Sequence, residues 1–243
     1  MSKLQKVTSV RMAEGEGAEV NRLFPTKNHQ QHHDPFVLMD EFIVKSPAEF
    51  SQHEHRGFEA VTYMLEGSFV HNDNLGHNSE VKKGGAQVFN AGKSLYHSEK
   101  PGSSGYSRGI QLWVNLPQSK KDSEPYYQSL EKVPVIDNNP GMIIRQIFGP
   151  TSPLNIYTEI KYLDIELDKG QNWTYQPPET QQGILYLQQG QLTVNNLSLS
   201  ATEGILFPSS SSLKLKARTD SRFLIVSGDP HQQNMKIRGS FVE

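Results

Sequence analysis

The chain has 243 residues, no cysteine and a formal net charge of -2 at pH 7. This length is enough for one large domain or two small ones with a substantial core. Without cysteine, disulfides, thiolate metal sites and a cysteine nucleophile are excluded. The balance of 24 basic and 26 acidic residues creates no basic field for nucleic acid or an acidic membrane, so small or neutral partners are favoured.

The first residues, Met1 to Thr8, lack the apolar run of a signal peptide, and no later segment resembles a membrane span. We therefore expect a cytoplasmic protein that neither crosses a membrane nor binds nucleic acid directly. Weak alternation over residues 1–24, interrupted at Gly15 to Gly17, predicts two strands joined by a turn.

The segment from His29 to Phe42 contains three histidines and then a mixed apolar and acidic stretch. His29, His32 and His33 lie in a polar stretch without alternation, so we predict solvated loop histidines and not a metal site. Residues 34–42 are predicted to be a core-packing strand or an extended segment that lies under the barrel, with Asp40 and Glu41 as polar edges.

The first motif that carries chemistry is His53-Glu54-His55. In a β-strand, residues at i and i+2 point to the same face, so both imidazoles would share one side. The apolar run at 60–65, the turn pair Glu66-Gly67 and the apolar residues from Ser68 predict strand, turn and strand.

A second motif, His97-Ser98-Glu99, repeats the same spacing. A strand is predicted at 86–89 between Gly84-Gly85 and the break at 90–92, and it leads into the motif. The two motifs would then lie on neighbouring parts of one sheet, which brings His53, His55, His97 and Glu99 together.

Three neutral imidazoles and one carboxylate suit iron, manganese, cobalt, nickel, copper or zinc, and differ from a structural thiolate site. Four protein ligands leave open positions on an octahedral metal, which favours chemistry or small-molecule binding. Surface histidines are the alternative for either motif alone. Glu59 is an alternative to Glu99, although a solvated or ion-paired carboxylate is favoured for Glu59, and Glu66 has a similarly weaker claim.

Other polar and aromatic residues receive structural interpretations. His71 and His77 flank turn residues at 72–76 and are predicted to be exposed. Gln111 and Trp113 share a face of a strand predicted at 110–116, where they line a cavity or fill the barrel interior. The polar stretch after Pro117 is predicted to be a linker, with a short helix at 126–132.

The second half repeats the first in outline. Residues 186–190 match 63–67, and the same offset sets Gln176 against His53 and Pro178 against His55. A second, metal-free barrel is therefore expected.

The chain resembles the pirin family of the cupin superfamily. The resemblance is carried by residues 53–67, 90–92 and 97–99, with further similarity at 34–42 and 111–117. It implies an all-β fold of two tandem cupin (jelly-roll β-barrel) domains, a metal-binding domain at 1–132 and a metal-free domain with a tail at 133–243. It also implies that His53, His55, His97 and Glu99 hold iron. Glu54 and Gly84-Gly85 depart from the usual pirin pattern without touching a proposed ligand.

Pirin-like proteins include quercetin 2,3-dioxygenases, which implies a flavonol-like aromatic substrate, O2, and Fe(II) as the metal. Glu99 would be both ligand and catalytic base, taking the proton of the flavonol 3-hydroxyl. The alternative from the same family is a non-enzymatic, metal-dependent redox sensor that binds a protein partner. A purely structural metal is a third interpretation.

Overall fold

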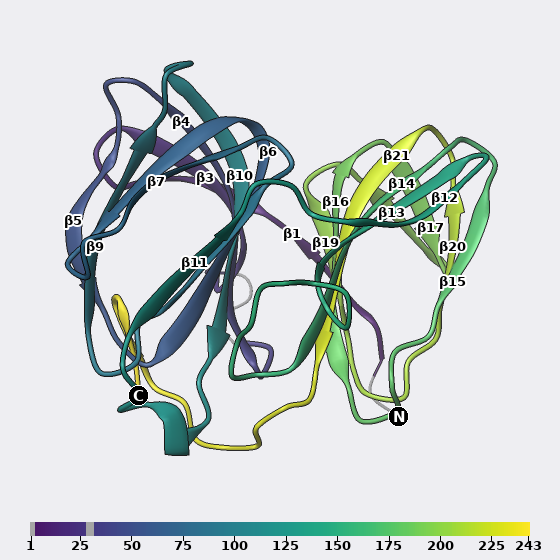
Figure 1. Cartoon of the computed structure of the whole chain (residues 1–243). Helices are drawn as coiled ribbons and strands as arrows, with labels where there is room; N and C mark the ends of the chain where they lie inside the picture. The colour runs from purple at the N-terminus through teal and green to yellow at the C-terminus, as the bar shows by residue number, and fades with distance from the viewer. Residues whose placement is uncertain (1–2, 28–31) are drawn as a thin grey trace. The chain divides into compact units, whose positions relative to one another are not determined.

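The computed structural model describes residues 3–27 and 32–243, and these residues form an almost entirely β protein (Figure 1). The predicted all-β fold is confirmed, since the helical elements of the described residues amount to one 3-10 turn, η1 (Gln118–Lys120). Within the same residues no helix has the length and apolar character needed to cross a membrane.

The chain divides into two compact units, and both are discontinuous in sequence. The N-terminal barrel comprises Val10–Val133, Pro153–Thr158 and His231–Glu243. The C-terminal barrel comprises Pro134–Ser152, Glu159–Pro230 and the described residues 3–9. The first strand, β1 (Gln5–Thr8), pairs with β19 (Glu203–Phe207). The predicted domains were two continuous segments, 1–132 and 133–243. The observed units differ, because the first strand of the chain belongs to the C-terminal barrel and the C-terminal tail belongs to the N-terminal barrel.

The N-terminal barrel is built from antiparallel strands in two facing groups. One group has the order β11-β8-β6-β10-β4-β3-β2, and the other joins β7, β6, β9 and β5. The bounds of these strands are β2 (Val10–Glu14), β3 (Ala18–Phe24), β4 (Phe36–Lys45), β5 (Phe50–His55), β6 (Phe58–Asp73), β7 (Asn78–Lys82), β8 (Ala86–Asn90), β9 (Leu95–Pro101), β10 (Tyr106–Asn115) and β11 (Tyr126–Leu130). The short strands β22 (Ile237–Arg238) and β23 (Phe241–Val242) form a hairpin in the tail.

Strand β6 connects the two groups. Its first part pairs with β8 and β10, and its part from Ser68 onward pairs with β7 and β9. The expected turn at Glu66-Gly67 is wrong: the strand continues, with a register shift against β10 and a positive φ of 66° at Gly67. A side chain at Gly67 would collide with the carbonyl oxygen of Tyr106, 1.9 Å away, so the bend requires glycine.

The C-terminal barrel repeats this plan around an apolar interior. Its seven-stranded sheet has the order β1-β19-β16-β21-β14-β13-β12, and its four-stranded sheet the order β15-β20-β17-β18. The remaining bounds are β12 (Val135–Asn139), β13 (Met142–Phe148), β14 (Ile160–Leu167), β15 (Asn172–Tyr175), β16 (Gln182–Gln189), β17 (Gln191–Val194), β18 (Leu197–Ser200), β20 (Leu213–Ala217) and β21 (Ser221–Gly228). One apolar cluster draws on both sheets, and the described part of this barrel contains no group of side chains able to hold a metal.

Two local expectations are wrong. Residues 126–132 do not form a helix; Tyr126–Leu130 is strand β11, which pairs with β8, so its sheet partner overrides the local pattern. Asp40 and Glu41 are buried and do not form polar edges, since each binds an arginine, Arg22 for Asp40 and Arg108 for Glu41.

Leu187 is fully buried in the apolar core of the C-terminal barrel. We expect Leu187→Ala to lower the free energy of unfolding of this barrel by about 2–5 kcal/mol, because it leaves a cavity. Ile136, on β12 and 42% exposed, is the matched control, and Ile136→Ala should change that free energy by less than about 0.5 kcal/mol. Chemical denaturation measures both; equal effects would contradict the assignment of this core.

Candidate metal centre

Strands β5 and β9 position the residues of both sequence motifs. The two strands are antiparallel neighbours, with His53 directly opposite His97 and His55 opposite Leu95. Along β9, His97 and Glu99 are buried while Tyr96 and Lys100 are exposed. The predicted alternation is therefore confirmed for the second motif.

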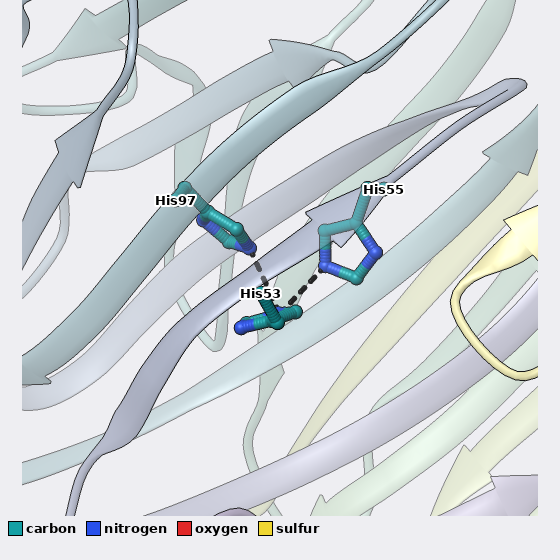
Figure 2. Close-up of side chains that lie close together, drawn as sticks. All are labelled: His53, His55 and His97. Carbon is teal, nitrogen blue, oxygen red and sulfur yellow. Dashed lines mark hydrogen bonds between the residues drawn. The ribbon is translucent and has the colours of Figure 1, made fainter.

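The three histidines converge on one point (Figure 2). Nε2 of His53 lies 2.8 Å from Nε2 of His55 and 3.1 Å from Nε2 of His97. The rings come from strands β5 and β9 and turn nitrogens toward one another (Figure 2), and in all three rings this nitrogen is Nε2. Such a cluster is typical of a metal site and differs from scattered surface histidines.

Backbone carbonyl groups determine which nitrogen of His53 and His55 carries the proton. Nδ1 of His53 lies 2.7 Å from the carbonyl oxygen of Ser51, and Nδ1 of His55 lies 3.3 Å from that of Ser240. A carbonyl oxygen only accepts, so each Nδ1–H donates and each Nε2 keeps its lone pair.

His97 lies beside His71, which is held by two carboxylates. Nε2 of His71 lies 3.0 Å from Oδ2 of Asp73, so this nitrogen donates its proton to the carboxylate. Nδ1 of His71 lies 3.5 Å from Nδ1 of His97 and 3.7 Å from Oε1 of Glu99. Burial opposes protonation of His71, but the hydrogen bonds and charges of Glu99 and Asp73 raise its pKa. Nε2 of His97 faces His53.

Three imidazole lone pairs that face one another repel unless a cation lies between them. Nitrogen ligands of a metal with bonds of about 2.0–2.1 Å lie roughly 2.8–3.4 Å apart, from octahedral to tetrahedral angles, which agrees with the observed 2.8 and 3.1 Å. Ligating histidines also commonly donate their second N–H to a carbonyl or carboxylate. The residues therefore fit a metal ion on donor type, spacing and hydrogen bonding.

Glu99 lies beside this cluster and is bound by two amides. Nε2 of Gln87 donates to Oε1 of Glu99 at 2.6 Å, and Nε2 of Gln111 donates to Oε2 at 3.4 Å. Ligand atoms of Glu99, His71 and His97 lie within 4.8 Å of one another, as do those of the three histidines. Glu99 is thus grouped with His97 and His71 and not with all three predicted histidines, and the four-ligand set stays a prediction.

His71 is the residue of this centre that the sequence did not reveal. It was expected to be exposed but is fully buried, opposite Glu99 on the neighbouring strand, whereas His77 is exposed as expected. The spacing of His71 and Asp73 at i and i+2 was a usable signal, hidden by the turn residues that follow. His32 and His33 belong to neither metal-ligand group, and the prediction for His29 lies outside the described residues.

The two alternative ligands, Glu59 and Glu66, and the neighbouring Glu54 are engaged elsewhere. Glu54 accepts hydrogen bonds from Arg56 and Ser94. Glu59 is fully buried, contrary to the solvated or ion-paired role favoured for it, and accepts from the hydroxyl of Tyr126 and the amide of Tyr157. Burial raises the pKa of Glu59 to about 7. Glu66 pairs with Arg108.

A cavity of about 360 Å³ opens onto the histidines and Glu99. Its volume lies within the roughly 300–1,000 Å³ of small-molecule sites. Gln111 and Trp113 both line it, in agreement with the cavity alternative for these residues. Apolar walls come chiefly from Val20, Val37, Leu38, Phe42, Phe50 and Trp113.

The C-terminal tail completes one wall of the cavity. Ile237, Gly239 and Ser240 line it, and Val242 is buried among apolar residues of the N-terminal barrel. The amide of Val242 donates to the carbonyl oxygen of Arg56 at 3.0 Å, directly after the first histidine motif. The tail therefore both encloses the cavity and supplies the carbonyl group that orients His55.

Comparisons with known proteins agree with this geometry. The Pirin family model matches residues 17–114, and the Pirin C-terminal cupin domain model matches residues 162–243. The chain belongs to the pirin family. The match confirms the predicted pair of cupin domains.

Individual pirin relatives cover nearly the whole chain. A pirin-like protein of Solanum lycopersicum is 34% identical over 249 residues, covering 98% of this chain and 85% of the relative. The structure of a quercetin 2,3-dioxygenase from Acinetobacter baumannii is 28% identical with a TM-score of 0.89, covering 98% of this chain and 90% of that chain. A bacterial pirin from Escherichia coli, solved in complex with nickel(II), shares the fold at 19% identity and a TM-score of 0.79, covering 94% of this chain and 100% of that one.

Burial makes two histidines of the candidate metal centre, His55 and His97, hard to protonate. Desolvation, and then the charge of His53, lowers the pKa of His55 to about 3. Desolvation also lowers the pKa of His97 well below its usual value of 6.5, with the neighbouring histidines adding to the effect. Both rings are therefore neutral and able to bind a metal at pH 7.

The metal-free protein should lose stability as the pH falls from about 6.5 toward about 3. In this window the unfolded chain protonates His55 and His97 while the folded chain does not, so protons favour unfolding. Chemical denaturation at a series of pH values measures this slope. The double variant His55→Gln/His97→Gln should flatten it, and an unchanged slope would contradict buried neutral rings.

Displacing the tail should weaken metal binding by the pirin site. A side chain at Gly57 would lie 1.9 Å from the carbonyl oxygen of Val242, so Gly57→Ala should move the tail and remove the acceptor for His55. We expect a loss of about 10–100-fold in Zn²⁺ affinity, measured by competition with a chelating dye. Gly76→Ala is the control, because Gly76 also has a positive φ but no neighbour within 4 Å; equal affinities in the two variants would contradict a role for the tail.

Proposed function

We propose that the protein is a pirin-type quercetin 2,3-dioxygenase that uses O2 to open the central ring of a flavonol with release of carbon monoxide. The observation that carries the proposal is the convergence of three Nε2 lone pairs beside a buried carboxylate in a cavity with apolar walls. The similarity to a quercetin 2,3-dioxygenase structure at 28% identity supports it.

His53, His55, His97 and Glu99 are the proposed ligands of Fe(II). When bound, the metal supplies Lewis acidity for the flavonol oxygens and a redox centre for the reaction with O2. The chain contributes the orientation of its ligands, since the carbonyl oxygens of Ser51 and Ser240 accept the Nδ1 protons of His53 and His55, and His71 lies against Nδ1 of His97. These partners keep the rings in the tautomer that binds a metal.

Glu99 is the proposed general base. Its carboxylate would take the proton of the flavonol 3-hydroxyl, and burial strengthens that contact because water does not compete for it. Gln87 and Gln111 each donate one amide hydrogen to it, so both oxygens are oriented before substrate binds.

The cavity walls suit a flat aromatic substrate. Trp113 stacks on Phe58 with ring centroids 4.0 Å apart, so its indole is a rigid surface. With Leu38 and Phe42 it forms an apolar slot that would hold the flavonol rings and exclude water from the reacting atoms.

The Fe(II)-loaded protein should consume quercetin in air, measured by loss of its absorbance together with carbon monoxide release. Glu99→Gln should reduce turnover by about 10²–10⁴-fold, the usual contribution of a general base. Glu66→Gln is the control, because Glu66 lies on the same barrel but is half exposed and pairs with Arg108. Equal turnover by the wild type and Glu99→Gln would exclude this role.

Metal content measured on the same samples separates this proposal from the regulatory alternative. A stable metal with no turnover of any flavonol would favour a metal-dependent redox sensor that acts on a protein partner. Turnover that requires both the metal and Glu99 favours the enzyme.

A further inference from the structure

A continuous row of polar side chains crosses the inner face of the large sheet of the N-terminal barrel. Thr62 on β6 is paired with Gln87 on β8 and with Gln111 on β10. Gln111 is paired with Asp40 on β4, and Asp40 with Arg22 on β3. Directly opposed residues of antiparallel strands share a face, so these five side chains form one row.

The row interrupts an otherwise apolar surface. The residues two positions before and after the row, on the same face of each strand, are buried and apolar. They are Leu38 and Phe42 around Asp40 on β4, and Ala60 and Met64 around Thr62 on β6. Burying polar groups in such surroundings costs free energy unless they have partners. An interior that served only for packing would be apolar here, as it is in the C-terminal barrel.

One end of the row serves Glu99. Gln87 and Gln111 donate to its two oxygens, and the fully buried hydroxyl of Thr62 lies between them in the row. That hydroxyl has no hydrogen-bond partner within the described ranges 3–27 and 32–243. The row is thus incompletely satisfied without a further polar molecule.

The other end is an ion cluster of two carboxylates and one guanidinium. Arg22 donates to Asp40 through Nε at 2.9 Å and through Nη2 at 2.7 Å, and Nη2 also donates to Glu14 at 2.8 Å. All three line the same cavity as His53, His55 and His97. The cluster offers the oxygens of two carboxyl groups against one guanidinium, so it favours hydrogen-bond donors over anions.

The strand order sets the distance between the two ends. Strands β10, β4 and β3 are successive neighbours, so with strand spacings of about 4.8 Å the backbone of Asp40 lies about 5 Å across the sheet from Gln111, and that of Arg22 about 10 Å. Apolar side chains fill the rows on either side. A flat molecule lying along the row would meet polar groups along its length and apolar side chains on both flanks.

We propose that Asp40, held by Arg22 and assisted by Glu14, is a second substrate anchor that binds phenolic hydroxyl groups on the ring farthest from the metal centre. The ligand class is a planar polyphenol with chelating oxygens at one end and hydroxyl donors at the other. This subsite rests on the proposed function for its reaction, whereas binding to it is measurable without turnover.

The chain offers its own binding probe. Of its two tryptophans, Trp113 lines the cavity and Trp173 lies on β15 of the C-terminal barrel. In a Trp173→Phe background, quenching of Trp113 fluorescence reports occupancy. Anaerobic titrations of the Zn²⁺-loaded protein would compare galangin, kaempferol and quercetin, flavonols that carry no, one and two hydroxyls on the pendant ring.

We expect quercetin to bind about tenfold to a hundredfold more tightly than galangin, as for a hydrogen bond to a charged group. Asp40→Asn should bring that ratio close to one and leave galangin binding nearly unchanged. Glu41→Gln is the matched control, because Glu41 is the adjacent buried carboxylate, also paired with an arginine, and faces the opposite side of β4. It should keep the wild-type ratio.

Glu14→Gln keeps the test decisive if Asp40→Asn fails to fold, since the Glu14 side chain is 42% exposed. It should reduce the preference for quercetin and improve binding of a flavonol sulfated on the pendant ring. A wild-type ratio near one, or a ratio unchanged in the Asp40 or Glu14 variant, would overturn the subsite. Loss of flavonol turnover with the ratio intact would instead overturn the proposed reaction and leave the subsite standing.

Discussion

The candidate centre depends on one constraint: three imidazoles turn Nε2 toward a common position because another group holds the opposite edge of each ring. These groups are the carbonyl oxygens of Ser51 and Ser240 and, for His97, the ring of His71, which is itself bound to Asp73. Without these partners the rings would turn or exchange tautomers to avoid repulsion. The metal-binding character therefore comes as much from the partners behind the rings as from the rings themselves.

The two barrels show what the same plan does with and without this arrangement. Gly67 and Gly190 both have positive φ and both pass close to backbone atoms of another strand, so the backbone bend is common to the two halves. The interior differs: the C-terminal barrel is filled by one apolar cluster, while the N-terminal barrel keeps a cavity with histidines, amides and charges. The two halves thus share a backbone plan, but the cavity lined by histidines, amides and charged groups lies in the N-terminal barrel.

The ends of the chain matter to both barrels. Strand β1 pairs with β19 of the C-terminal barrel, and the tail supplies both the acceptor for His55 and part of the cavity wall in the N-terminal barrel. The position of Glu99 also depends on the polar row. Gln87 and Gln111 donate to Glu99, and the row continues from them to residues on β6, β4 and β3. The cavity is consequently a product of the whole barrel and its tail.

The sequence alone determined the all-β class, the pair of barrels and the placement of His53, His55, His97 and Glu99 on paired strands, because alternation and turn residues act locally. It did not reveal buried His71, the strand at Tyr126–Leu130 or the buried pair of Asp40 and Arg22. Each of these depends on which strands become neighbours. Only the tertiary structure decides that, since hydrogen-bond partners far apart in sequence fix tautomers, override local propensity and make a buried charge tolerable.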